Sequence, residues 1–275
     1  MYASNYLETA IINLMRRTAL SAPSNLYVGL FLGNPTDSGS AAEEVVYSGY
    51  QRQAVNFSLD ESSYSIYNSA QITFPESTTT LGQNVTHIGI YDAVTGTPAT
   101  SASIHMWLYG ELVTPLAIQT NVSPVFRPNS IRWTMNGNIS DYYKRNILNV
   151  IRHQTATLSG FSPFIGLCKY DPNTDGNAEF SGNAYERIGG TNGVDFTQPS
   201  TDSQSAMATT TSNSADIASP NPATGYWGNL TYAGIYTAKT GGQLFASVPL
   251  GGNSYNMNEG SVAGFRAGQL TFSVN

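Results

Sequence analysis

The clearest candidate for chemistry in this sequence is the segment Asp171-Pro172-Asn173-Thr174-Asp175-Gly176. Oxygen-bearing side chains at alternate positions before a turn glycine are typical of the opening of a calcium-binding loop. Such a loop also needs a bidentate Glu at position 182, where the sequence has Gly182. The pattern therefore favours an Asx/Pro turn between strands. It leaves open whether Asp171, Asn173 and Asp175 hold calcium.

Other residues of catalytic type are not grouped in the sequence. His87, His105 and His153 lie far apart, so no zinc site is predicted, and no Gly-x-Ser-x-Gly elbow marks a hydrolase. Asp60 and Glu61 are adjacent, whereas a glycan-cleaving depolymerase requires two carboxylates across a cleft, roughly 5 to 9.5 Å apart. We therefore predict no enzyme activity, no catalytic residue, no cofactor and no metal site.

A group of tyrosines offers a binding alternative. Tyr47, Tyr50, Tyr64 and Tyr67 occur close together among polar residues, and exposed aromatic rings of this kind stack on sugars. Burial on one face of a strand explains the same pattern, and we favour this explanation.

The elements that would position any site occur twice. Gly29-Leu30 returns 137 positions later as Gly166-Leu167. Further matches follow in the same order, pairing residues 68–72 with 213–217, 86–91 with 231–236, and 126–133 with 265–272. A tandem duplication of one module of roughly 135 residues is the simplest explanation. We predict one module over residues 1–137 and a second over 138–275.

Each module is predicted to open with a helix and continue as strands. Apolar spacing predicts helices over residues 7–20 and 141–157, with Asn5 and Glu8 capping the first and Ser140 or Asp141 capping the second. Short runs between turn residues predict strands over 27–31, 52–57, 70–74, 87–91, 105–109 and 130–134. The polar stretch 198–219 is predicted to be a long exposed loop. The expected fold is therefore all-β with one helix per module, as two tandem antiparallel β-sandwiches.

Composition narrows the class of partner. Charged residues make up only 11% of the chain, against about 25% in average soluble proteins, and the net charge is −6. Negative charge repels phosphate backbones and anionic bilayers, so neither nucleic acid nor membrane is an expected partner. The N-terminus lacks the pattern of a signal peptide, so we expect the chain to be made in the cytoplasm. The single cysteine, Cys168, matches Phe31 in the repeat and is expected to be buried.

Two motifs carry a resemblance to a known family. The first is the Val-Thr-His-Ile-Gly-Ile-Tyr-Asp-Ala stretch at 85–93, matched by Trp-Gly-Asn-Leu-Thr-Tyr-Ala-Gly-Ile-Tyr-Thr-Ala at 227–238. The second is Gly-Tyr-Gln-Arg at 49–52, which becomes Ala-Tyr-Glu-Arg at 184–187. Together with their order, they resemble bacteriophage virion proteins commonly labelled tail fibre or minor tail proteins. That family usually carries one module, whereas this chain carries two.

The resemblance implies a structural role in the virion and no known catalytic residues. We expect a tail- or neck-associated component that docks on other virion structural proteins, within a homo-oligomer or symmetric assembly. A capsid decoration protein is one alternative. A host-glycan-binding module of the adsorption apparatus, using the tyrosines and the 198–219 loop, is another.

Overall fold

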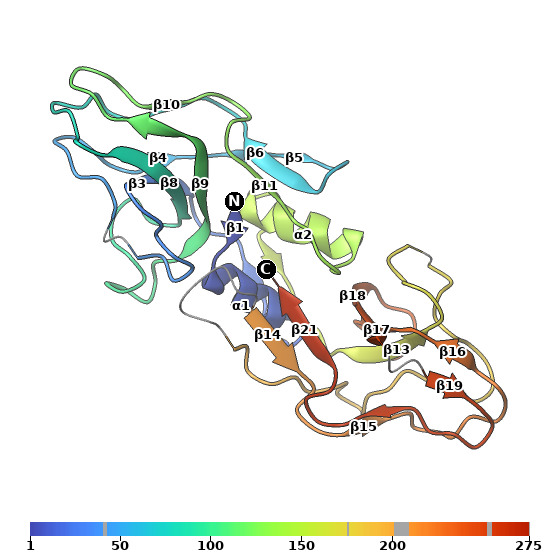
Figure 1. The fold of residues 1–275 in the computed structure, drawn as a ribbon. Helices are drawn as coiled ribbons and strands as arrows, with labels where there is room; N and C mark the ends of the chain where they lie inside the picture. Colours follow the sequence, from blue (N-terminus) through green and yellow to red (C-terminus); the bar gives the residue numbers. More distant parts are fainter. Residues whose placement is uncertain (41–42, 175, 201–208, 252–254, 275) are drawn as a thin grey trace.

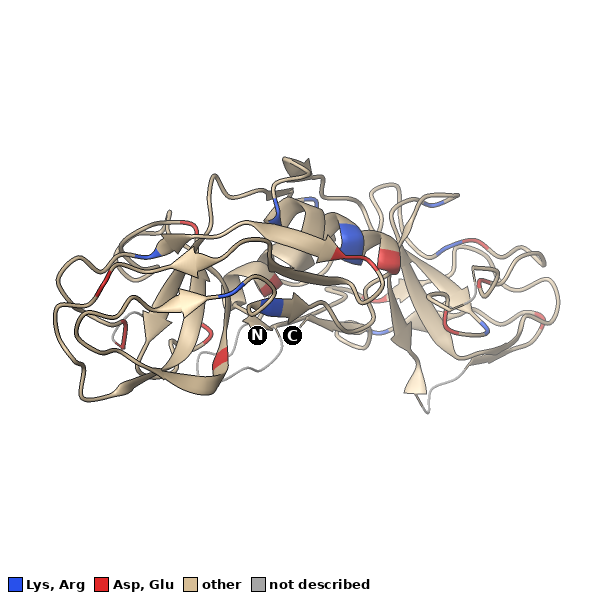
Figure 2. Cartoon of the chain, turned by 90° about the horizontal axis from the view of Figure 1, so that it is seen from above, with Lys and Arg blue, Asp and Glu red and all other residues tan. Residues whose placement is uncertain are grey.

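The chain folds into antiparallel sheets with one helix in each half. The computed structural model describes residues 1–40, 43–174, 176–200, 209–251 and 255–274. β-structure dominates, and the two helices lie near the middle of an elongated molecule with sheets toward both ends (Figures 1 and 2). The predicted fold class is confirmed.

The elements of the two halves follow similar orders. The first half contains β1 (Tyr2–Ala3), α1 (Asn5–Leu14), β2 (Leu20–Ser21), β3 (Tyr27–Phe31), β4 (Gln53–Ala54), β5 (Phe57–Asp60), β6 (Ser65–Asn68), β7 (Ile72–Thr73), β8 (Asn84–Tyr91), β9 (Met106–Ala117), β10 (Val125–Phe126) and β11 (Arg132–Thr134). The second contains α2 (Asp141–Ile151), β12 (Thr157–Leu158), β13 (Phe164–Cys168), β14 (Thr209–Ser212), β15 (Ile217–Ala218), β16 (Gly228–Leu230), β17 (Tyr232–Tyr236), β18 (Leu244–Pro249), β19 (Tyr255–Met257), β20 (Gly264–Phe265) and β21 (Thr271–Val274).

Helix α1 is shorter than predicted and is capped by a different residue. The Ser4 hydroxyl accepts a hydrogen bond from the Leu7 amide at 3.3 Å and so caps the helix. The predicted caps Asn5 and Glu8 lie inside the helix instead. The helix ends at Leu14, and Arg17 then adopts a φ of 66°, which no α-helix can continue.

Helix α2 repeats this design. Ser140, one of the two predicted caps, accepts from the Tyr143 amide at 3.4 Å. The helix ends at Ile151, six residues before the predicted end at 157, and His153 has a φ of 61°. The segments that leave the two helices then pair with each other as β2 and β12. This pairing between the halves ends both helices early, and helical periodicity in the sequence does not reveal it.

Several strands depart from the prediction. β3 has the predicted bounds, whereas β1 and β6 were not predicted and β9 runs eight residues beyond its predicted end. The predicted 198–219 loop is wrong in part, because it contains β14 and β15, and its residues 201–208 lie outside the described residues. β14 is rich in threonine, which suggested a loop by composition but suits a strand by its branched Cβ.

Each half has its own central sheet, and the two sheets have the same arrangement. β8 lies between β3 and β9, and β17 lies between β13 and β18, all antiparallel. In the first sheet Gly29 faces Gly89, and in the second Gly166 faces Gly234. The repeat seen in the sequence is therefore a repeat of strand register.

The helices tie the two halves together. Helix α1 contacts β9 of its own half and also β14 and β21 of the second half, and α2 contacts β18 and also β5 of the first half (Figure 1). Most of the buried apolar residues form one cluster that runs through both halves, and Phe31, Tyr91, Met106 and Tyr109 form a second, smaller one. The division of the chain into folding units at Gly137 stays a prediction.

Charged side chains are few and dispersed. Figure 2 shows basic and acidic residues scattered along the molecule, and neither kind covers a whole face in this view. Within the described residues, neither helix combines the length and the apolar character that a membrane span requires.

Candidate functional site

A buried polar cluster lies beside β3 in the first half. The Glu44 carboxylate accepts hydrogen bonds from the Tyr50 hydroxyl (2.9 Å) and from two nitrogens of Arg52 (2.9 and 2.8 Å). The Arg52 guanidinium also donates to the carbonyl of Gly96 at 2.8 Å and lies 3.6 Å from the ring centroid of Tyr91. One arginine thus ties a glutamate, a loop and an aromatic ring to the edge of the sheet.

The second half contains the same cluster. Glu179 accepts from the hydroxyl of Tyr185 (2.8 Å) and from two nitrogens of Arg187 (2.8 and 2.7 Å). Arg187 lies 3.6 Å from the ring centroid of Tyr236 and also donates to the Ala238 carbonyl at 2.7 Å. The cluster is therefore a property of the module.

The facing glycines make room for these clusters. A Cβ on Gly29 would come within 2.9 Å of the Glu44 carboxylate, and one on Gly89 within 2.7 Å of the Tyr91 ring. In the second half, a Cβ on Gly166 or Gly234 would come within 2.6 or 2.5 Å of the Tyr236 ring. Only glycine lets the ring lie flat against the strands at these positions.

The chemistry of the clusters is structural. Both oxygens of each glutamate accept from arginine, and each tyrosine hydroxyl also accepts from a backbone amide, Leu30 in one half and Leu167 in the other. Burial raises the pKa of Tyr50 and of Tyr185, so both phenols stay protonated at neutral pH. Groups linked by this many hydrogen bonds hold the loop in place.

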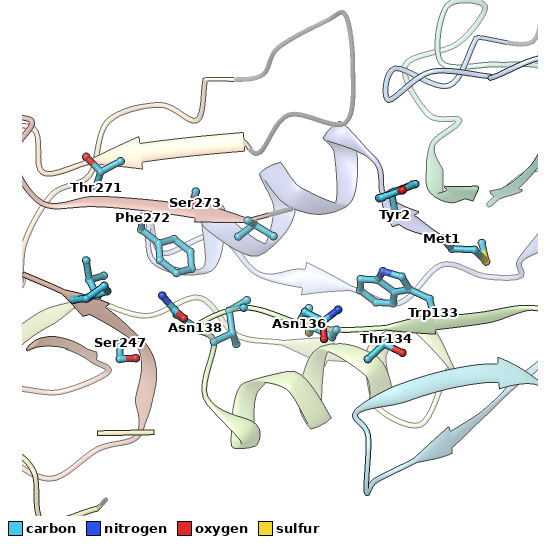
Figure 3. Close-up of a pocket in the computed structure, with 16 residues that line it drawn as sticks. Met1, Tyr2, Trp133, Thr134, Asn136, Asn138, Ser247, Thr271, Phe272 and Ser273 are labelled. Carbon is cyan, nitrogen blue, oxygen red and sulfur yellow. The ribbon is translucent and has the colours of Figure 1, made fainter. Parts of the chain in front are cut away.

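A groove of about 700 Å³ lies between the two halves. Figure 3 shows Thr271, Phe272 and Ser273 of β21 on one wall, and Trp133, Thr134 and the linker after β11 on the other. Met1 and Tyr2 lie at one end, and Ser247 of β18 lies near the other. None of the 16 side chains that line the groove is charged, although Met1 also brings its N-terminal amino group. Its chemistry suits an uncharged ligand or chain segment.

The candidate calcium loop forms a turn. The Asp171 carboxylate accepts the Asn173 amide at 3.0 Å, which is an Asx turn. The Asn173 side chain donates to the Asn138 carbonyl (3.0 Å) and the Ser247 hydroxyl (2.9 Å). Asp175 lies outside the described residues. Among the described residues, no group of three or more His, Cys, Asp or Glu side chains is placed to hold a metal ion.

The other candidate residues are engaged in packing or ion pairs. Tyr47 is 8% exposed and its hydroxyl donates to the Pro75 carbonyl, while Tyr67 lies against Arg132. Asp60 pairs with the same arginine at 3.0 Å, and hydrogen bonds from Ser62 and Arg132 lower the pKa of Asp60.

His105 and Cys168 are also held by neighbouring residues. His105 pairs with Asp92 at 2.7 Å and stacks on Tyr6. Burial raises the pKa of the Cys168 thiol to about 12, so this side chain remains a protonated strand residue.

Comparison with known families accounts for both halves. A family model described as podophage GP4 fiber I protein gp80 matches residues 2–134 and matches again over residues 138–273. The chain belongs to this podophage fiber protein family. The resemblance to phage virion proteins is thereby confirmed at the level of a phage fiber protein. A comparison with curated proteins found no match.

A buried carboxyl group forms one of the polar contacts between the two halves of the fiber chain. Glu8, 1% exposed on α1, accepts hydrogen bonds from the Thr209 hydroxyl (2.7 Å) and the Thr209 amide (3.1 Å) of β14. Burial raises the pKa of Glu8 to about 7, against the opposing effect of these bonds, and the charge of Asp37 adds to the rise. Burial also raises the pKa of Asp37 to about 6.

The raised pKa values of Glu8 and Asp37 predict that the free energy of unfolding falls as pH rises. Each binds its proton more tightly in the folded chain, so the folded state is favoured below the unfolded pKa near 4.5 and loses this advantage as pH passes 7. For Glu8 the full loss is roughly 3 to 4 kcal/mol, because its pKa rises from 4.5 to about 7 and one pKa unit is about 1.4 kcal/mol. Glu8→Gln should remove most of the decline between pH 5 and pH 8, measured by urea unfolding. Glu61→Gln, at an exposed carboxylate, is the control and should leave the decline unchanged. An equal decline in Glu8→Gln and wild type would contradict the assignment.

Analysis of the sequence found the tyrosine and arginine of both clusters as a repeated motif, but missed Glu44 and Glu179. The pattern Glu-x5-Tyr-x-Arg is present in both copies, at 44, 50 and 52 and again at 179, 185 and 187. Comparing the halves for shared charged residues, which are rare in this chain, would have found it. The groove had no comparable sequence pattern, because it forms where two distant edges approach.

Proposed function

We propose that this chain is a non-enzymatic structural protein of a phage particle that docks on other virion subunits as a tail- or neck-associated fiber component. The observation that carries the proposal is the fiber family match to both halves, over residues 2–134 and 138–273.

The buried chemistry of the chain supports this role. Each half keeps its Glu–Tyr–Arg cluster fully hydrogen-bonded, and each helix contacts strands of the other half. The clusters stabilise each module, and the helix contacts join the two modules into one body. The scarcity of charge also suits a protein that works in contact with other subunits.

The position and copy number of the chain in the particle test the proposal. Quantitative mass spectrometry of separated head and tail fractions should find a few to a few tens of copies per particle with the tail or neck. Hundreds of copies with the head would indicate a capsid decoration protein instead. Absence from both fractions would exclude a virion role.

A further inference from the structure

We propose that the edge of β21 in the central groove is a docking site for an extended, uncharged segment of another virion protein, which adds to β21 as a strand. This inference rests on the proposed function and names the surface through which the chain docks.

The free edge of β21 follows from its register with β14. The amide of Asn213 donates to the carbonyl of Leu270 at 3.2 Å, so residues 270, 272 and 274 point their backbone groups toward β14. The backbone amides and carbonyls of Thr271 and Ser273 therefore point away from β14, toward the groove. Among the described residues, none hydrogen-bonds to the backbone of Thr271 or Ser273 on that side. The edge offers donors and acceptors in the alternation that a strand requires.

The equivalent edge of the first half is protected. β11 occupies the same place in its module, and Arg132 stands where β21 has Thr271. Arg132 is about half exposed and pairs with Asp60 at 3.0 Å. Charged side chains on an edge strand discourage pairing with other chains. β21 has no charged residue or proline. The edge of β11 is therefore protected against pairing with another chain, whereas the equivalent edge of β21 is not.

The groove selects the chemistry of the added strand. Phe272 and Trp133, 4% and 5% exposed, contribute apolar rings to the groove, and the exposed Thr271 and Ser273 side chains lie on β21 beside it. Since none of the 16 lining side chains is charged, a charged side chain inserted away from the Met1 amino group would lose its hydration without gaining an ionic partner. An uncharged, extended segment fits these features.

The size of the groove favours a single segment over a whole sheet. A residue in a packed sheet occupies about 160 Å³, from a rise of about 3.3 Å, a strand spacing of about 4.8 Å and a sheet spacing of about 10 Å. A cavity of about 700 Å³ therefore holds four or five residues of one strand, which matches the length of β21.

Hydrogen exchange on purified particles tests the proposal with an internal control. The Ser273 amide should exchange on the order of tenfold more slowly, or slower still, in the particle than in the purified free chain. The neighbouring Phe272 amide, which faces β14, should be protected alike in both samples. Fragmentation within the C-terminal peptide separates these two amides. Equal exchange of Ser273 in both samples would overturn the proposal.

Charge on the edge gives a second test. The double variant Thr271→Lys/Ser273→Lys should be incorporated into particles at about a tenth of the wild-type copy number, when each is supplied to a phage that lacks the gene. The matched control Ser69→Lys/Gln71→Lys adds the same charge at exposed positions of the first half and should incorporate normally. Thermal unfolding of each purified variant should match the wild type, which separates lost docking from misfolding.

The outcomes distinguish this inference from the proposed function. Absence of the wild-type chain from particles would contradict both the proposed function and this inference. Normal incorporation of the double lysine variant, with the wild-type chain present, would overturn the groove assignment alone. Protection of Ser273 that grows with the concentration of the free chain would overturn it in favour of a second copy. Protection by added host surface polysaccharide would overturn it in favour of a glycan.

Discussion

The isolated fragment 1–137 should fail to fold as a stable unit, and so should the fragment 138–275. Separating them removes β14 and β21 from α1, and removes α2 from β5. Helix α1 buries Leu7, Ile11, Ile12 and Leu14 at 0% exposure, and each such side chain contributes about 1.5 to 3 kcal/mol when fully buried. Glu8 would also lose Thr209, its hydrogen-bond partner. These losses together are comparable with the whole stability of a domain of this size, about 5 to 15 kcal/mol.

Near-ultraviolet circular dichroism and hydrogen exchange of each fragment would measure the effect. The matched control is the full chain carrying a protease site at Gly137 that is cleaved after folding. Gly137 itself is kept, because its φ of 88° favours glycine, and the protease site is inserted directly after it, where a Cβ on Gly137 would meet nothing within 4 Å, so the nicked chain should keep its fold. Mixing the two fragments should restore native signals. Cooperative unfolding of 1–137 alone, at the melting temperature of the full chain, would show instead that the predicted division at Gly137 separates two independent folding units.

Arg52→Met should destabilise the chain by about 3 to 5 kcal/mol, the usual cost of removing one partner from a buried ion pair. The Arg52 side chain is 1% exposed, and its loss would leave the Glu44 carboxylate, 15% exposed, without a cation. The carbonyls of Ala93 and Gly96 would also lose their donor. Arg187→Met should behave similarly, because its contacts with Glu179 are equivalent.

Urea unfolding of each variant at pH 7 measures the cost. The control is Arg17→Met, which removes an arginine whose pair with Asp195 is solvent-exposed, at 40% and 71% of the two side chains. Such pairs contribute about 0 to 1 kcal/mol. Similar small losses in Arg52→Met and Arg17→Met would mean that the buried cluster does not hold the module together.

The sequence alone determined the repeat, the fold class and one strand in detail. Gly29-Leu30 and Gly166-Leu167 lie in β3 and β13 because an apolar run broken by one glycine can pack on both faces of a sheet. Apolar periodicity also located both helices, since it depends only on neighbours within three or four positions. The fiber family follows from motifs that lie within single strands and turns.

Tertiary structure alone decided how the halves are joined. The helices end early at Leu14 and Ile151 because β2 pairs with β12, a contact between residues far apart in the chain. The threonine-rich β14 forms because β21 pairs with it and Glu8 accepts its first hydroxyl. The free edge of β21 and the groove beside it exist only where the two halves meet. Local propensity cannot specify such features, because their energies come from partners that the chain brings together only when it is folded.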